Sequence, residues 1–154
     1  MKARRQTANS KVYKQQGNST QNQANENFYG TWLIKRTIAF GRVYALSDEE
    51  IRNILGETIE FSPEKASFQN KICKNPIYKR SILSETDFFT HNGYTSFKEI
   101  GFQGKNIVKV EVFNEKEDYR NLWYSIGRKF FIKDENTLIT NYEGVFFELV
   151  KYNK

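Results

Sequence analysis

Few residues in this sequence have the types and spacing that a catalytic or metal site needs. A single histidine and a single cysteine, His91 and Cys73, cannot supply the ligand set of a zinc site, and no segment has the spacing of a calcium-binding EF-hand loop. Glu115, Glu117 and Asp118 suggest the paired carboxylates of glycoside hydrolysis. A charged run between two strands is more simply a solvated turn, so we expect no enzyme, no metal site and no cofactor.

The two reactive side chains that occur once each, His91 and Cys73, have simple structural interpretations. His91 has the chemistry of a general base, but its place near the end of a predicted short helix is typical of a surface histidine. Cys73 has the chemistry of a nucleophile, but it falls in a predicted strand, where a small, at least half-buried thiol is the simpler interpretation.

Aromatic residues carry the remaining signal for function, at 16% of the sequence. They fall on predicted strands, where they either line a cavity for an apolar molecule or fill the interior of the fold, and the sequence leaves both open. Together with one charged neighbour, the candidate ligand-binding residues are Arg36, Phe40, Phe61, Phe68, Trp123, Phe131, Tyr142 and Phe147.

The elements that position these residues are mainly strands. Alternation, β-branched runs and turn residues predict strands over 28–40, 58–61, 66–73, 77–83, 107–113, 121–126, 129–133, 137–142 and 145–152. Ser47 and Glu50 form a capping box that begins a helix between the first two strands, and Ser84 begins a second helix. Ser96 and Glu99 predict one further helical turn. The sequence thus predicts an all-β, antiparallel up-and-down β-barrel with short helices.

The chain divides into a tail over 1–27 and a domain over 28–154. The tail is polar and low in complexity, so we expect a disordered tether, or simply a frayed terminus. It carries +4 of the net charge of +6, so the nearly neutral domain has little reason to bind nucleic acid. No apolar run is long enough for a transmembrane span. We expect a monomer, either tethered outside the cytoplasm if a signal segment was removed or otherwise cytoplasmic.

Gly30, Thr31 and Trp32, at the start of the first strand, resemble the Gly-x-Trp signature of the calycin barrels, which include lipocalins and fatty-acid-binding proteins. The layout resembles that of small bacterial lipocalin-like proteins. This resemblance implies that Trp32 closes one end of the barrel under a basic side chain from a late strand, with Arg128 and Lys151 as candidates. It implies a binding protein for a small apolar or amphipathic molecule. The alternative is a filled barrel that acts as a tethered protein–protein interaction module.

The sequence leaves two arrangements of the first strand open, which differ in the direction of the Arg36 side chain. Strict alternation places it on the same face as Trp32 and Phe40, which would direct a charge into the barrel and require an acidic partner such as Glu60 or an anionic ligand head. Alternatively, a β-bulge near Lys35 and Arg36 turns the guanidinium out to water.

Overall fold

The computed structural model describes residues 26–114 and 121–153 of the 154-residue chain, so nearly all of the predicted tail, and the acidic run over 115–118, lie outside the described residues. The described part is mostly β-structure with two short helices. The elements in chain order are β1 (Gly30–Phe40), α1 (Asp48–Ile54), β2 (Thr58–Phe61), β3 (Lys65–Phe68), β4 (Lys71–Lys74), β5 (Ile77–Ser84), α2 (Glu85–His91), β6 (Asn106–Phe113), β7 (Lys129–Asp134), β8 (Thr137–Tyr142) and β9 (Val145–Lys151).

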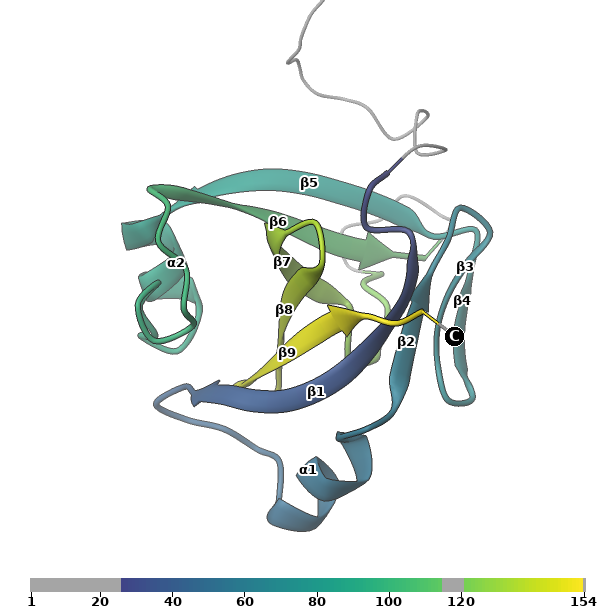
Figure 1. Ribbon diagram of the computed structural model, residues 1–154, viewed down its shortest axis with the longest axis horizontal. Helices are drawn as coiled ribbons and strands as arrows, with labels where there is room; N and C mark the ends of the chain where they lie inside the picture. Colours follow the sequence, from purple (N-terminus) through teal and green to yellow (C-terminus); the bar gives the residue numbers. More distant parts are fainter. Residues whose placement is uncertain (1–25, 115–120, 154) are drawn as a thin grey trace, which may run out of the picture.

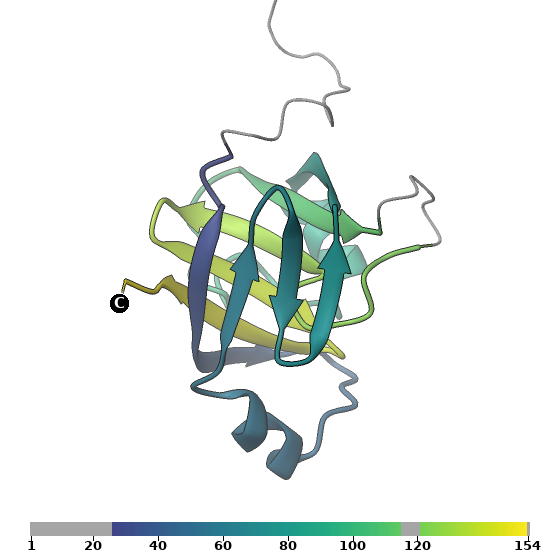
Figure 2. The same ribbon diagram turned by 90° about the vertical axis from the view of Figure 1, so that its right-hand side faces the viewer.

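The strands form one antiparallel sheet of nine strands, in the order β4-β3-β2-β1-β9-β8-β7-β6-β5. The sheet curls strongly, as Figures 1 and 2 show, but no ladder of backbone hydrogen bonds joins the edge strands β4 and β5. The predicted antiparallel β-architecture is therefore present as a curled half-barrel, and the ladder does not close into the predicted barrel.

Two of the predicted strands differ in the structure. The segment 66–73 is a hairpin of β3 and β4, because the chain reverses at Gln69, whose φ is +54°. The segment 121–126 contains only an isolated bridge between Phe113 and Leu122. It then turns tightly, with Ser125 N donating to Trp123 O at 3.0 Å, which ends any strand there.

The predicted helix starts are confirmed. Ser47 and Glu50 exchange both hydrogen bonds of a capping box at the start of α1. Ser84 caps α2 through the backbone N–H of Asp87 at 3.2 Å. These signals depend on residues three positions apart, so the sequence alone is enough to find them.

The concave face of the sheet carries the larger of two hydrophobic cores, which we call the inner cluster. Phe28, just before β1, inserts its ring here and contacts the rings of Phe61, Tyr78 and Phe130 at centroid distances of 6.3, 5.0 and 5.2 Å. Several of its large side chains are at most 1% exposed, among them Trp32, Phe28, Phe61, Phe130, Phe147, Ile34 and Ile59.

The convex face is partly covered by α2 and by the turn that follows it. Alternation along the strands sends Phe131 and Phe146 to this face, while their neighbours Phe130 and Phe147 belong to the inner cluster. Phe88 of α2 packs its ring 4.9 Å from that of Phe131. We call this second core the outer cluster; it comprises Phe88, Phe97, Ile100, Ile107, Phe131, Ile139 and Phe146.

Because the Phe28 ring is inserted in the inner cluster, we expect that residues before Asn27 can be removed without loss of stability and that Phe28 cannot. Before it, Glu26 pairs with Arg80 at 2.7 Å, and Arg80 is 40% exposed, so the pair contributes at most about 1 kcal/mol. We predict that a chain beginning at Asn27 has nearly the thermal midpoint of the full chain, whereas a chain beginning at Gly30, which lacks Phe28, unfolds at a clearly lower temperature. A fall of several degrees in the Asn27 chain would contradict this boundary.

Candidate functional site

Arg36 lies on the convex face. The pairing of β1 with β9 shifts register between Ile34 and Arg36, so the β-bulge alternative is confirmed and the inward arrangement is wrong. Arg36 is 61% exposed and donates from Nε to Glu148 at 2.7 Å. Hydrogen bonding to Glu148 raises the pKa of the guanidinium. The counter-charge for Arg36 is therefore a strand neighbour, and the guanidinium does not face the interior.

Two of the predicted aromatic ligand-binding residues also lie outside the inner cluster. Phe40 is 45% exposed and stacks on Tyr44 with the centroids 4.8 Å apart. The two register shifts of β1 together return Phe40 to the face of its partner Val145, which belongs to the inner cluster, but Phe40 is the last residue of the strand and its ring stays exposed. Phe131 is part of the outer cluster because it alternates with Phe130.

The concave face brings together the other five predicted residues, but three of them are packing partners. Phe61, Trp123 and Phe147 are buried in the inner cluster. The rings of Phe61 and Phe130 lie 4.6 Å apart, a contact distance that leaves no room between them. Phe68 and Tyr142 lie at the α1 end of this core.

A basic side chain from a late strand lies over Trp32, as expected from the sequence. Lys151, from β9, places its Nζ 4.6 Å from the centroid of the Trp32 ring and donates to Tyr29 O at 3.0 Å. On the other side, Trp32 Nε1 donates to Phe28 O at 2.9 Å. Lys151 is thus the basic residue over Trp32, whereas Arg128, the other candidate, lies over Tyr142.

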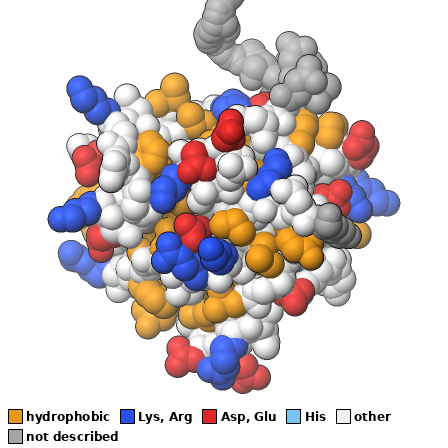
Figure 3. All heavy atoms as spheres, viewed as in Figure 1, with side chains coloured by type: hydrophobic (Ala, Val, Ile, Leu, Met, Phe, Trp, Pro, Cys, Tyr) orange, Lys and Arg blue, Asp and Glu red, His pale blue; other side chains and the backbone are white. Residues whose placement is uncertain are grey.

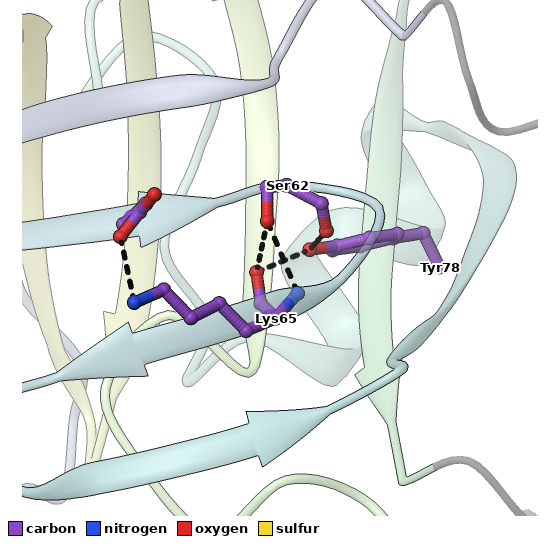
Figure 4. A network of polar contacts seen from close by, with 4 residues as sticks. Ser62, Lys65 and Tyr78 are labelled. Carbon is purple, nitrogen blue, oxygen red and sulfur yellow. Dashed lines mark hydrogen bonds and ion pairs between the residues drawn. The ribbon is translucent and has the colours of Figure 1, made fainter.

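Side-chain contacts bridge the gap between the β4 and β5 sides of the sheet, which no ladder of backbone hydrogen bonds joins. Tyr78 of β5 reaches the β2–β3 turn, where its hydroxyl donates to Ser62 O at 2.8 Å and lies 3.5 Å from Lys65 O (Figure 4). On the β4 side, Cys73 Sγ lies 3.3 Å from Oδ1 of Asn114. These contacts join the two edges of the half-barrel.

The buried hydroxyl of Tyr78 makes the free energy of unfolding depend on pH in the alkaline range. Burial raises the pKa of its hydroxyl well above the usual value of about 10. The unfolded chain therefore loses this proton first, so the contribution to stability is complete below about pH 10 and falls as the pH rises further. We predict that Tyr78→Phe makes this alkaline loss shallower, measured by urea unfolding between pH 8 and 11. Tyr124→Phe, which alters an exposed ring, is the control, and an unchanged slope in Tyr78→Phe would contradict the assignment.

A pocket opens between α1, the β3–β4 hairpin and the end of β8, and we call it the α1 pocket. Its volume is about 200 Å³. Its walls combine apolar side chains with a polar edge, and its lining residues are Leu46, Glu50, Asn53, Ile54, Phe68, Gln69, Lys71 and Tyr142. This is where the predicted residues Phe68 and Tyr142 border open space.

Cations and tyrosines alternate at the edge of the α1 pocket. Lys71 Nζ lies 5.7 Å from the centroid of the Tyr124 ring, and Arg128 lies 5.8 Å from Tyr124 and 5.3 Å from Tyr142. Burial raises the pKa of Tyr142, and Glu143 adds to the shift. Since Tyr124 is 77% exposed, this edge offers a ring and positive charges to a bound molecule.

Among the described residues, no group of three or more His, Cys, Asp or Glu side chains is placed to hold a metal ion. No helix in the described part of the chain is long and apolar enough to span a membrane. On the face of the molecule seen in Figure 3, basic and acidic side chains are interspersed with hydrophobic ones.

No family model, curated protein or solved structure matches this chain.

Sequence reasoning missed most of the α1 pocket. Leu46 and Ile54 lie just before and within the helix that Ser47 and Glu50 predict, and Lys71 falls within the predicted strand over 66–73. The pocket joins segments from 46 to 142, so no local pattern predicts it. The hydrophobic residue before the helix cap is the one signal in the sequence that points to contact between α1 and the sheet.

Proposed function

We propose that this protein is a non-enzymatic, calycin-like binding protein that holds a small apolar or amphipathic molecule in the α1 pocket. The observation that carries the proposal is the pocket itself, with Leu46, Ile54 and Phe68 as apolar walls and Lys71 at the polar edge. Apolar walls with a few placed polar groups are typical of ligand sites. The contact of Lys151 with Trp32 supports the calycin resemblance.

The size of the pocket limits the ligand. A cavity of ~150 Å³ is enough for benzene, and the α1 pocket measures about 200 Å³. The proposed ligand, or the part of it that is bound, is therefore a single ring or a short chain with a polar substituent. Binding inside the half-barrel would require the inner cluster to open, because its rings are in contact.

A titration with phenol, followed by ¹H–¹⁵N NMR, tests this proposal. We expect saturable shifts around Leu46, Ile54 and Phe68. Asn53→Trp should abolish them, because Asn53 lines the pocket and a larger ring there would occupy it. Arg52→Trp, one residue earlier on the exposed side of α1, is the matched control and should bind as the parent does. Shifts that persist in Asn53→Trp, or that occur elsewhere, would overturn the proposal.

An interaction module is the second candidate, and an exposed strap over 41–45 favours it. Its backbone is held in place, since Gly41 N donates to Gly144 O at 2.7 Å and Ala45 N to Glu143 O at 2.9 Å. A Cβ on Gly144 would overlap the carbonyl of Val43, so the junction is tight. Exposed hydrophobic side chains on and beside this strap are Phe40, Val43, Tyr44, Phe89 and Tyr94.

Native mass spectrometry of the protein purified from its own host separates the two candidates. The ligand-binding function predicts a retained small molecule that is lost in Asn53→Trp. The interaction module predicts a stoichiometric protein partner that is retained in Asn53→Trp and lost in Val43→Asp, since a buried, unpaired charge disfavours an apolar contact.

A further inference from the structure

A second pocket lies on the convex face of the sheet, and we call it the Lys129 pocket. It has a volume of about 290 Å³. Lys129 precedes Phe130 of the inner cluster, so alternation along β7 directs its side chain to the convex face, away from the α1 pocket. The lining is almost entirely polar and comprises Glu111, Leu122, Arg128, Lys129, Asn141, Glu143 and Gly144.

Around this pocket, the part of the chain that the structure describes gives the Lys129 amine no ion-pair partner. Glu143 pairs with Arg128 at 3.3 Å, and Glu111 pairs with Lys109 at 3.5 Å. Lys129 forms no ion pair or side-chain hydrogen bond within the described residues, although it faces Glu111 across the β6–β7 ladder. Burial, together with the positive charges of Lys109 and Arg128, lowers the pKa of the Lys129 amine, and the negative charge of Glu111 offsets part of this shift. A half-buried ammonium without an acceptor gains more from an anion than an exposed one does.

The positions of the pocket walls are fixed by hydrogen bonds. Thr140 Oγ1 donates to Lys129 O at 2.6 Å, which ties the backbone of Lys129 to β8. Asn141 Nδ2 donates to Oδ1 of the buried Asn92 at 3.1 Å, and Asn92 Nδ2 donates to Phe88 O at 3.0 Å. The amide group of Asn141 is therefore held in one orientation at the pocket.

Arg128 adds donors to those of Lys129. A guanidinium has five N–H donors, and within residues 26–114 and 121–153 the Arg128 side chain uses one of its nitrogens, donating from Nη2 to Glu143. The Arg128 guanidinium lies 5.8 Å from the ring of Tyr124 and 5.3 Å from the ring of Tyr142. These two contacts restrain the guanidinium at the edge of the pocket. An oxygen near Lys129 Nζ would thus have a second cationic donor close by.

We infer that the Lys129 pocket binds the oxyanion group of a small polar molecule, a carboxylate or a phosphate, with Lys129 Nζ as its principal donor and Arg128 as the second. The ligand supplies an acceptor that the described residues do not give to the Lys129 side chain. Glu111 lies within 4 Å of Lys109 and Glu143 within 4 Å of Arg128, so the addition of Lys129 gives this group of side chains a net positive charge. The inference rests on residues separate from the proposed α1 ligand site, apart from Arg128 at its edge.

The test is an NMR titration of protein labelled with ¹³C in its lysine side chains, with inorganic phosphate and with acetate as separate probes at constant ionic strength. We expect a saturable shift of the Lys129 Cε resonance with at least one probe, and a titration of Lys129 that moves to higher pH when that probe is bound. Phosphate alone would assign a tetrahedral group, and acetate alone a carboxylate. Phenol in the α1 pocket should not compete.

Lys129→Met should weaken binding about tenfold or more, the effect of removing a charged hydrogen-bond partner. Lys105→Met, at an exposed lysine outside the pocket, should bind as the parent does. Equal, unsaturable shifts of all lysines with both probes would overturn the inference, as would parental affinity in Lys129→Met. The shift of Lys129 in the parent decides the matter even if Lys129→Met does not fold.

Discussion

Replacing Trp32 with alanine is expected to lower the free energy of unfolding by about 3–5 kcal/mol, as other large-to-small changes in a core do. Trp32 is 1% exposed, and its indole N–H donates to Phe28 O. The change would also leave the amine of Lys151 without the ring beneath it. Urea unfolding followed by circular dichroism measures the loss.

Tyr124→Ala is the control for this prediction, since the Tyr124 ring is 77% exposed and its truncation removes little buried area. A second readout is the fluorescence of Trp32 in a Trp123→Phe background, where a buried indole emits at short wavelength. A red-shifted emission, together with nearly parental stability of Trp32→Ala, would mean that Trp32 does not close the half-barrel.

Phe28→Ala is expected to cost a similar amount, about 3–5 kcal/mol, and to leave a cavity at the centre of the inner cluster. The Phe28 ring is 1% exposed and contacts rings from β2, β5 and β7. Phe40→Ala is the matched control, because the same truncation at a ring that is 45% exposed should cost far less. Equal effects of the two changes would contradict the placement of Phe28.

The Phe28→Ala variant also tests whether the interior of the half-barrel is filled by side chains or is open to a ligand. If Phe28 fills the interior, its removal should create affinity for benzene that the parent lacks at this position. Urea unfolding with and without benzene measures that gain, because a ligand that binds only the folded state raises stability.

The sequence predicts local features well. The capping boxes at Ser47 and Ser96 and the hairpins of the C-terminal meander depend on neighbours in the chain, and the structure has them. Gly30, Thr31 and Trp32 located the start of β1, and the resemblance they carry pointed to Lys151 as one of two candidates to lie over Trp32.

Features that depend on distant partners were not predictable in the same way. The exposure of Arg36 follows from a register shift against β9, which alternation within β1 cannot reveal. The reversal at Gln69 uses a positive φ in a residue other than glycine, so the turn has no strong sequence signal. Both pockets combine residues from segments far apart in the chain, so their lining was visible only in three dimensions.

The central claim is that aromatic side chains fill the half-barrel, so that small molecules bind at the α1 pocket. A crystal structure of the protein under xenon pressure tests it most directly, since xenon enters dry apolar cavities. We predict xenon among Phe61, Tyr78 and Phe130 only in the Phe28→Ala variant, because the rings of the inner cluster are in contact in the parent protein. Xenon between those rings in the parent protein would contradict the account.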